Sequence, residues 1–402
     1  MIEASQPLPK RKIAITILVV FLYWVALYLF VPTLPVYVQS KVNDLAIVGV
    51  ILSMYGLWQI FSRMPSGILS DWIGWRRPDI LIGMALVGLG AWILAHAQSA
   101  TGLLIGRSIT GIGAGAWVPM VVLFTSLFPP KDVIKATAIL SAVNSVGRIV
   151  GSASNGFLTS LGGYLLPFEV SVGASVVAIV ALLLLSEKRH PPQKPSLRKL
   201  GVLFIRRDVL LPSLLSAILH YGDWTASFTF TPILAAQLGA SNALLSLLAS
   251  LNLGMVLLGN AFSTAMSHRL GSKNLIVICF FMQSLGIAVA ALAHSLLVVF
   301  LAQCAIGFAF GVGYPVLMGL SIEKVDHLEQ NSAMGLHQSV YALGMFAGPW
   351  LSGILAKAIG IQPMFGIVAG CILVLGLLGQ RTLKTRTEVL KQTGEVLLVD
   401  QK

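Results

Sequence analysis

The chain consists of long runs of apolar residues separated by short polar segments. Apolar runs of about 18 or more residues predict helices that cross a lipid bilayer, and such runs recur from Ile13 to Leu378. We place twelve spans, with ends accurate to about four residues, at residues 13–38, 46–69, 79–97, 102–127, 134–159, 168–186, 209–233, 242–267, 274–294, 296–320, 332–356 and 361–379. The pattern therefore predicts an all-α, polytopic membrane protein.

Composition agrees with this prediction. Of 402 residues, 56% are hydrophobic and only 10% are charged, with a mean hydropathy of +0.86. A soluble protein of this size needs far more charge to cover its surface. The three cysteines, Cys279, Cys304 and Cys371, all fall within apolar runs, so we expect neither a disulfide framework nor a metal site, and no cofactor.

The net charge of +12 is distributed unevenly between the loops. If the N-terminus lies inside the cell, 22 of the 27 Lys and Arg fall in cytoplasmic segments, and the outer loops hold only Lys41 and Lys357. This bias is the positive-inside pattern of membrane proteins. We therefore expect both termini in the cytoplasm, a location in the cell inner (plasma) membrane, and anionic lipid headgroups, not nucleic acid, as the partners of the basic residues.

The two halves of the chain repeat each other. The polar connection 186–208 divides the spans six and six, and the glycine spacing of residues 147–156 recurs 197 residues later in residues 344–353. Proteins built from such repeats bind substrates near the bilayer midplane, between halves that rock about the site. The predicted organisation is an N-terminal bundle (1–186), a cytoplasmic linker (187–208), a C-terminal bundle (209–380) and a cytoplasmic tail (381–402).

The loop after the second span, "GILSDWIGWRRPD" (67–79), resembles the Gly-xxx-Asp-xx-Gly-basic signature of the major facilitator superfamily. The resemblance covers nearly the whole chain and implies the two-bundle, twelve-helix fold of that superfamily. It also implies a gate on the cytoplasmic side; the alternative is a capped turn whose charges only fix the topology. The residues that match the signature are Gly67, Asp71, Gly74, Arg76 and Arg77.

Further motifs resemble one branch of this superfamily, the twelve-helix drug–proton antiporters of multidrug efflux. The segment "RSITGIGAGA" (107–116) resembles an element of proton-coupled members, and "FVPTLP" (30–35) resembles the antiporters' Pro-x-x-Pro signature. The antiporters' Gly-Pro-x-x-Gly-Gly element is altered, because Arg148 and Ser152 replace its proline and one glycine.

Charged residues inside the spans are candidate functional residues, because burying a charge in a bilayer costs several kcal/mol. Arg63 lies close enough to the cytoplasmic end of its span to reach the headgroups. Arg148 and Asp223 lie roughly 15 Å deep, and Asp223 is the only deep acid, since Glu169 stands at a boundary. We assign proton coupling to Asp223, Arg107 and Arg148; the alternative is a static Asp–Arg pair that holds the halves together.

The arginines outnumber the deep acids, so we expect a net positive cavity lined by aromatic side chains. For most of the candidate lining residues, packing is the alternative role. The candidates for the substrate cavity are Tyr23, Trp24, Tyr28, Trp117, Asn144, His220, Tyr221, Trp224, Asn252, Gln303, Tyr314, His337 and Tyr341.

These features predict a secondary active transporter, expected to be a monomer, that exports small amphipathic molecules in exchange for protons by alternating access. A positive cavity favours neutral or anionic substrates. The alternatives are uptake or facilitated exchange of an organic anion or sugar, and a membrane receptor that transports nothing. No nucleotide-binding Gly-rich loop or metal-ligand spacing occurs in the sequence, so we do not expect an enzyme.

Overall fold

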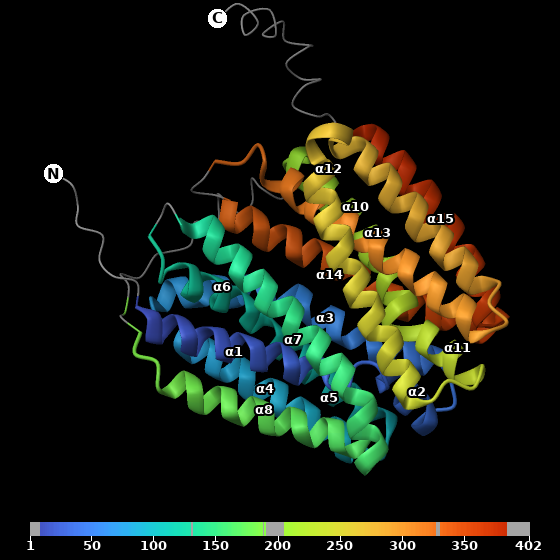
Figure 1. Cartoon of the computed structure of the whole chain (residues 1–402), viewed down its shortest axis with the longest axis horizontal. Coiled ribbons are helices and arrows are strands. Elements are labelled where there is room, and N and C mark those ends of the chain that lie inside the picture. The colour runs from blue at the N-terminus through green and yellow to red at the C-terminus, as the bar shows by residue number, and fades with distance from the viewer. Residues whose placement is uncertain (1–8, 130–131, 188, 190–204, 327–329, 384–402) are drawn as a thin grey trace, which may run out of the picture.

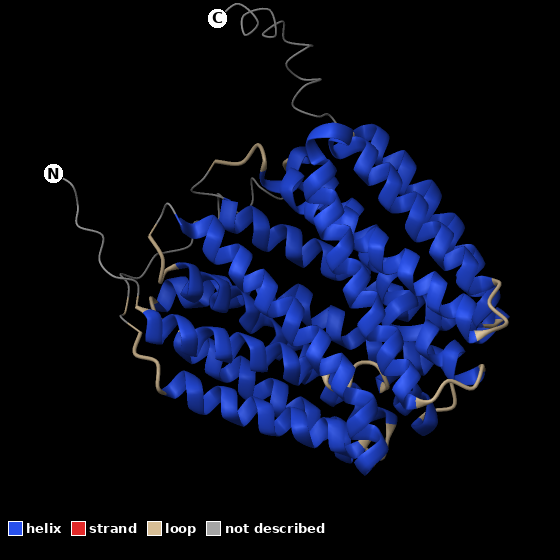
Figure 2. Cartoon of the chain, viewed as in Figure 1, coloured by secondary structure: helices blue, strands red, loops and turns tan. Residues whose placement is uncertain are grey.

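The computed structural model describes residues 9–129, 132–187, 189, 205–326 and 330–383, and within these residues the only regular secondary structure is helical (Figures 1 and 2). The first half comprises α1 (Lys10–Tyr28), α2 (Leu34–Lys41), α3 (Leu45–Ile73), α4 (Arg77–His96), α5 (Ala100–Gly113), α6 (Trp117–Thr125), α7 (Val133–Gly162) and α8 (Leu165–Leu183). The second half comprises α10 (Arg207–Thr225), α11 (Thr231–Gln237), α12 (Asn242–Ala291), α13 (Leu296–Ile322), α14 (Gln330–Ile359) and α15 (Ile361–Thr382).

These helices make up the twelve predicted spans. Among the described residues, nine helices are long and apolar enough to cross a membrane. The remaining spans are α7, the broken segment α10–α11, and the second part of α12. Helix α12 is two helices in sequence, because Gly271 has φ 72° and ψ 160°, which a helix does not contain. The two separate spans predicted at 242–267 and 274–294 are confirmed.

Three spans are interrupted near their middles. The first breaks between α1 and α2, where Pro32 and Pro35 lack the N–H that a continuous helix requires. A 3₁₀ turn at Ala114–Ala116 joins α5 to α6, and a π-helical turn at Ala226–Phe230 joins α10 to α11. The residues of the 3₁₀ turn and nearly all those of the π-helical turn are buried, so these breaks lie in the interior of the molecule, where protein surrounds the irregular backbone.

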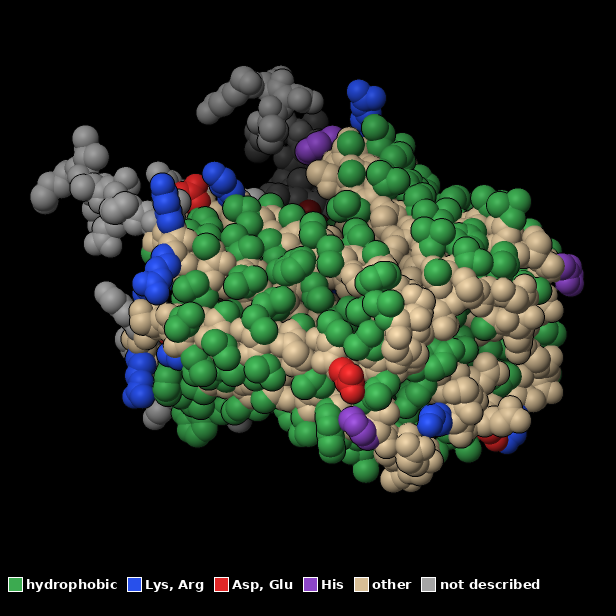
Figure 3. Space-filling model, turned by 60° about the horizontal axis from the view of Figure 1, so that its bottom comes forward, with side chains coloured by type: hydrophobic (Ala, Val, Ile, Leu, Met, Phe, Trp, Pro, Cys, Tyr) green, Lys and Arg blue, Asp and Glu red, His purple; other side chains and the backbone are tan. Residues whose placement is uncertain are grey.

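The surface is that of a membrane protein. Large apolar side chains such as Phe61, Phe157, Leu184 and Leu297 are exposed, and Figure 3 shows a broad hydrophobic surface with Lys and Arg gathered at its edges. We call the ends of the bundles at which α1, α7, α10 and α14 begin the basic end. The opposite end, at which α3 and α12 begin, is the far end.

The two halves meet along two pairs of helices, α3 with α14 and α7 with α12. Glycines permit the close approach, since a Cβ on Gly49 would overlap the carbonyl oxygen of Pro349, and one on Gly56 would lie 2.6 Å from the carbonyl carbon of Met345. In Figure 1 the bundles converge at the lower right, where α2 lies against α11.

Polar contacts between the halves close the far end. Lys357 Nζ lies 2.6 Å from Asp44 Oδ2, and Ser246 Oγ donates to Asn155 Oδ1 at 3.0 Å. Tyr164 Oη donates to Asn242 Oδ1 at 3.4 Å. All three contacts lie at the far end of the helices they join, so the molecule is in a conformation closed at that end.

Residues 190–204 of the expected linker and 384–402 of the expected tail lie outside the described residues. Within the described part, α8 ends at Leu183 and α10 begins at Arg207, on either side of this segment.

Candidate functional site

A cavity of about 270 Å³ lies between the two halves, and helices of both contribute to its wall. Its lining reaches toward the basic end, because Ser141 stands two turns from the start of α7 and Met318 one turn from the end of α13. With the far end closed, the cavity extends toward the basic end only. This is the geometry of one state of a protein whose halves rock about a central site.

Asp223 and Arg148 face this cavity from opposite halves. Asp223 is 3% exposed, and its Oδ1 has no hydrogen-bond partner. The Arg148 guanidinium lies 4.6 Å from the centroid of the Tyr28 ring and 6.0 Å from that of Trp24. Among the described residues no salt bridge joins Asp223 to an arginine. The static Asp–Arg pair, the alternative to proton coupling, is therefore absent in this conformation.

Arg63 joins the two halves beside the cavity, contrary to the expectation that it reaches the headgroups. It is 6% exposed and donates to Gln59 Oε1 in its own helix at 2.8 Å. Across the interface it donates to Gln338 Oε1 at 2.7 Å and to the Tyr341 hydroxyl, both on α14. Partners within the protein satisfy the guanidinium, so it has no need to extend to the membrane surface.

Arg107 lies behind the cavity wall. It is 3% exposed, and its guanidinium stands 4.2 Å from the centroid of the Tyr55 ring. Tyr55 in turn stacks on Trp224 with ring centroids 5.3 Å apart, and Trp224 follows Asp223 in sequence. Arg107 is thus connected to the Asp223 region of the other half through two stacked side chains that line the cavity.

Aromatic rings cover much of the remaining wall. His220 stacks on Tyr341 at 4.1 Å between centroids and packs edge-on against Phe310 and Tyr314. Of the thirteen side chains expected at the cavity, eight line it: Trp24, Tyr28, Trp117, Asn144, His220, Trp224, Tyr314 and Tyr341.

The other five side chains have partners elsewhere in the bundles. Tyr23 donates to the Gly113 carbonyl at 3.2 Å, and the Tyr221 hydroxyl lies 3.0 Å from Ser352 Oγ. Asn252 donates to Gln303 Oε1 at 2.9 Å. His337 Nδ1 lies 3.0 Å from Ser213 Oγ. Each has a polar partner within its own half, which agrees with the packing alternative, although Gln303 Nε2 and His337 Nε2 are buried without a partner.

The sequence analysis missed Tyr55 and Gln59, which line the cavity with Arg63. These three residues are spaced by four, so they form one polar stripe along α3. That spacing is the signal that could have identified them.

The loop 67–79, which matches the family signature, is bonded within the first half. Gly74 has φ 67°, which favours glycine, and ends α3. The backbone N–H groups of Arg76 and Arg77 donate to the Glu187 carboxylate at 3.2 and 2.8 Å, and Arg77 Nη2 donates to the Leu183 carbonyl at 2.7 Å. The negative charge of this carboxylate at the start of α4 also interacts favourably with the helix dipole.

Gly67 and Asp71 are the other two residues of this loop that match the family signature. Gly67 lies close to Val118, since a Cβ at this position would stand 3.0 Å from Val118 Cγ1. The side chain of Asp71 lies outside the described part of the structure.

Comparison with known proteins identifies the family. The sequence model of the Major Facilitator Superfamily matches residues 16–218 and 213–396. The chain is 24% identical over 391 residues to the quinolone resistance protein NorA of Staphylococcus aureus (strain MRSA252), covering 91% of this chain and 96% of that protein. It is 21% identical over 374 residues to multidrug resistance protein 2 of Bacillus subtilis (strain 168), covering 89% and 91%.

A solved structure shares the fold. The crystal structure of a D-xylose–proton symporter superposes with a TM-score of 0.77 at 16% identity, over 95% of this chain and 99% of that one. The family match extends over both halves that enclose the cavity. The chain therefore belongs to the Major Facilitator Superfamily and is a multi-pass membrane transporter, not an enzyme.

Proposed function

We propose that this transporter exports small amphipathic molecules, neutral or anionic, in exchange for protons. The proposal depends on one observation: one carboxylate and two arginines line the same aromatic cavity between the halves. Asp223 is the only carboxylate among the described residues of its wall, which also holds Arg63 and Arg148.

Asp223 is the proposed proton carrier. In the present conformation no described cation forms a salt bridge with it, and a carboxyl group without a cation binds a proton more readily than a paired one. Arg148 belongs to the other half, so rocking of the halves changes its distance from Asp223. Approach of the arginine favours proton release, and withdrawal favours proton uptake.

The substrate class follows from charge and shape. Two arginines and one carboxylate give the wall a net positive charge when Asp223 is ionised. Flat rings such as Trp24 and Trp117, 5.2 Å apart between centroids, suit planar apolar molecules. The related NorA is named for quinolone resistance, and a quinolone combines a planar ring system with a carboxylate. A compound of this kind would match Arg148 and the rings together.

Orientation is proposed from the distribution of charge. With the basic end in the cytoplasm, the positive-inside rule is satisfied and the cavity opens toward the cytoplasm. This arrangement suits an exporter in the inner (plasma) membrane, acting as a monomer with both termini inside. The bundles are proposed to span 1–186 and 209–380, joined by the linker 187–208.

The test is the Asp223→Asn variant in proteoliposomes, with a fluorescent quinolone as the transported probe. We expect flux driven by an imposed pH gradient to be lost, while exchange of labelled for unlabelled quinolone without a gradient is retained. The control is Glu169→Gln, which neutralises an exposed acid near the start of α8, at the far end of the bundle. It should transport like the wild type. Driven flux at the wild-type level in Asp223→Asn would refute proton carriage by this residue.

A further inference from the structure

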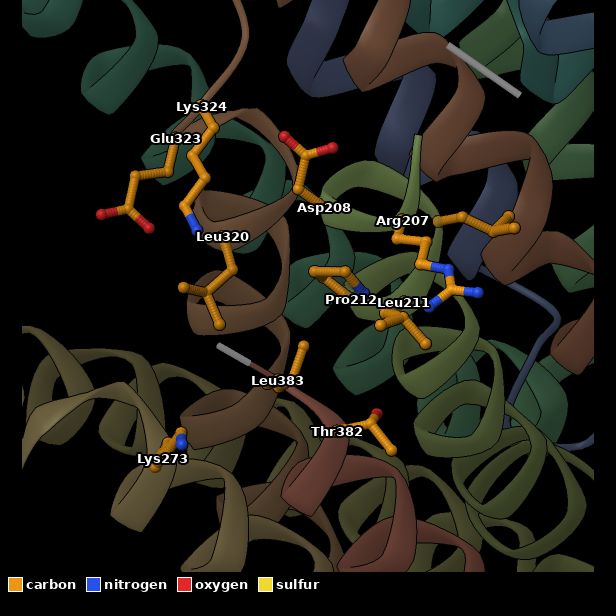
Figure 4. Close-up of a pocket in the computed structure, with 11 residues that line it drawn as sticks. Arg207, Asp208, Leu211, Pro212, Lys273, Leu320, Glu323, Lys324, Thr382 and Leu383 are labelled. Carbon is orange, nitrogen blue, oxygen red and sulfur yellow. The ribbon is translucent and has the colours of Figure 1, made fainter. Parts of the chain in front are cut away.

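A second cavity, of about 610 Å³, lies within the second half and apart from the transport cavity (Figure 4). Its wall is formed by the start of α10, the last turn of α13, the end of α15 and the part of α12 that follows the Gly271 turn. All of these segments lie at the basic end. None of its lining residues belongs to the wall of the transport cavity.

The charged residues of this wall are mainly cations. Arg207, Lys273 and Lys324 contribute three positive charges. The wall also holds the acids Asp208 and Glu323, so its net charge is +1, and Asp208 is bound by Arg206 from outside the wall, with Nη2 and Oδ2 2.6 Å apart. An excess of positive charge attracts an anion, and a phosphate accepts several hydrogen bonds from such side chains.

The floor of the same cavity is apolar. Leu211 and Pro212 of α10, Leu320 of α13 and Leu383 after α15 lie between the two lysines and Arg207 in Figure 4. Helix α15 leads to this place with Leu375 and Leu378 exposed on its outer surface, as expected of side chains that face lipid. A phosphate ion alone would leave this apolar floor unused.

We propose that this cavity binds one anionic phospholipid. Its anionic headgroup lies among the cations of the wall, Arg207, Lys273 and Lys324, and the upper part of an acyl chain covers Leu211 and Leu320. Cations and leucines occur together where the hydrocarbon of a bilayer meets its headgroups, and this combination suits a lipid better than a soluble anion. The lipid would join the ends of α10, α13 and α15.

The experiment uses the purified full chain and native mass spectrometry, with dioleoylphosphatidylglycerol and zwitterionic dioleoylphosphatidylcholine as probes. We expect the anionic lipid to be retained in preference, and the double variant Lys273→Gln/Lys324→Gln to weaken its binding about tenfold. The control Lys10→Gln/Lys135→Gln removes the same charge from exposed positions of the first half and should bind like the wild type.

A second variant tests the apolar part. Leu320→Trp keeps every charge but fills the cavity, and we expect it to lose the anionic lipid, whereas Leu184→Trp on an exposed face should not. The proposal is overturned if the double lysine variant, folded with an unchanged melting temperature, retains the lipid as the wild type does. It is also overturned if millimolar inorganic phosphate displaces the lipid completely, because the anion alone would then be the ligand.

Discussion

Arg148 and Asp223 face the same cavity from opposite halves, and the repeat of the other half duplicates neither charge. In the repeat of residues 147–156 by 344–353, Arg148 corresponds to Met345. Trp24 of the first span corresponds to Trp224 of the seventh, which aligns Tyr23 with Asp223. The first half thus contributes a fixed positive charge, and the second half a group that can change its charge. Two similar bundles therefore present different charged groups to the cavity.

Because burying charge in a bilayer is costly, the sequence alone marks Arg148 and Asp223 as candidate functional residues, and both line the cavity. Uncharged polar residues carry no comparable signal. Asn252 and Gln303 look like cavity residues in sequence, but they hydrogen-bond to each other within one half. Which neighbour satisfies a polar side chain depends on packing between distant segments, and a single sequence does not specify that packing.

We predict that Arg148 selects substrate by charge. Arg148→Gln should lower gradient-free exchange of a quinolone about tenfold, because a charge-assisted hydrogen bond to its carboxylate is lost. Gradient-free exchange of an uncharged amphipathic dye, which needs no proton release from Asp223, should change little. Arg148→Lys keeps the charge and should retain part of the quinolone flux. Equal losses for the charged and the uncharged probe in proteoliposomes would show that Arg148 does not read substrate charge.

At the scale of elements, the length of each apolar run predicts a membrane-spanning helix, but it does not predict where that helix is interrupted. The first, fourth and seventh spans break beside the cavity although their apolar runs continue through the breaks. The π-helical turn at Ala226–Phe230 directly follows the Asp223–Trp224 pair in the chain. It contains no proline or glycine itself, but Pro232 follows it and lacks the N–H that would bond to the Phe228 carbonyl within the turn. Such turns often mark functional sites.

The glycines of α3 and α13 should respond differently to a methyl group. Gly49→Ala places a Cβ against Pro349 of the other half, whereas Gly311→Ala places one against Val256 within the second half. We expect Gly49→Ala to open the far end while leaving the melting temperature nearly unchanged. Gly311→Ala should instead destabilise the second bundle, by about 1–3 kcal/mol for an overpacked contact.

The measurement is maleimide labelling of Ser246→Cys, which is buried at the far end, in a chain without its three native cysteines. Labelling should rise several-fold in Gly49→Ala and stay at the background level in Gly311→Ala. The reverse order would mean that Gly49 serves packing within its own bundle and does not control opening.

At the scale of the whole molecule, the repeat in the sequence predicts two bundles with a site between them, and the family match and fold agree with this arrangement. The sequence does not predict which end is closed. A transporter populates two conformations that differ by a few kcal/mol at most, and one sequence specifies both. The structure shows the closure at the far end in contacts between the halves, such as the ion pair of Asp44 with Lys357.

The ion pair at the far end should be independent of pH in the neutral range. A hydrogen bond from Lys357 lowers the pKa of Asp44, so the pair persists at neutral pH and is lost only as the pH falls through that lowered value. We predict that Lys357→Gln raises labelling of Ser246→Cys by the same factor at pH 6 and pH 8. Lys41→Gln, at an exposed cation of the same end, is the control. A pH-dependent factor would show that another group titrates in the closure.

The single carboxylate in the wall of the transport cavity limits the energetics of the proposed exchange. If Asp223 is the proton carrier and His220 stays neutral, each cycle carries one proton, so one solute leaves for one proton that enters. A neutral solute can then be concentrated outside about tenfold for each 59 mV of proton-motive force. A monoanion moves its own charge outward as well, so the membrane voltage acts twice on each cycle. An energised membrane would therefore expel the anionic form of a drug more steeply than the neutral form.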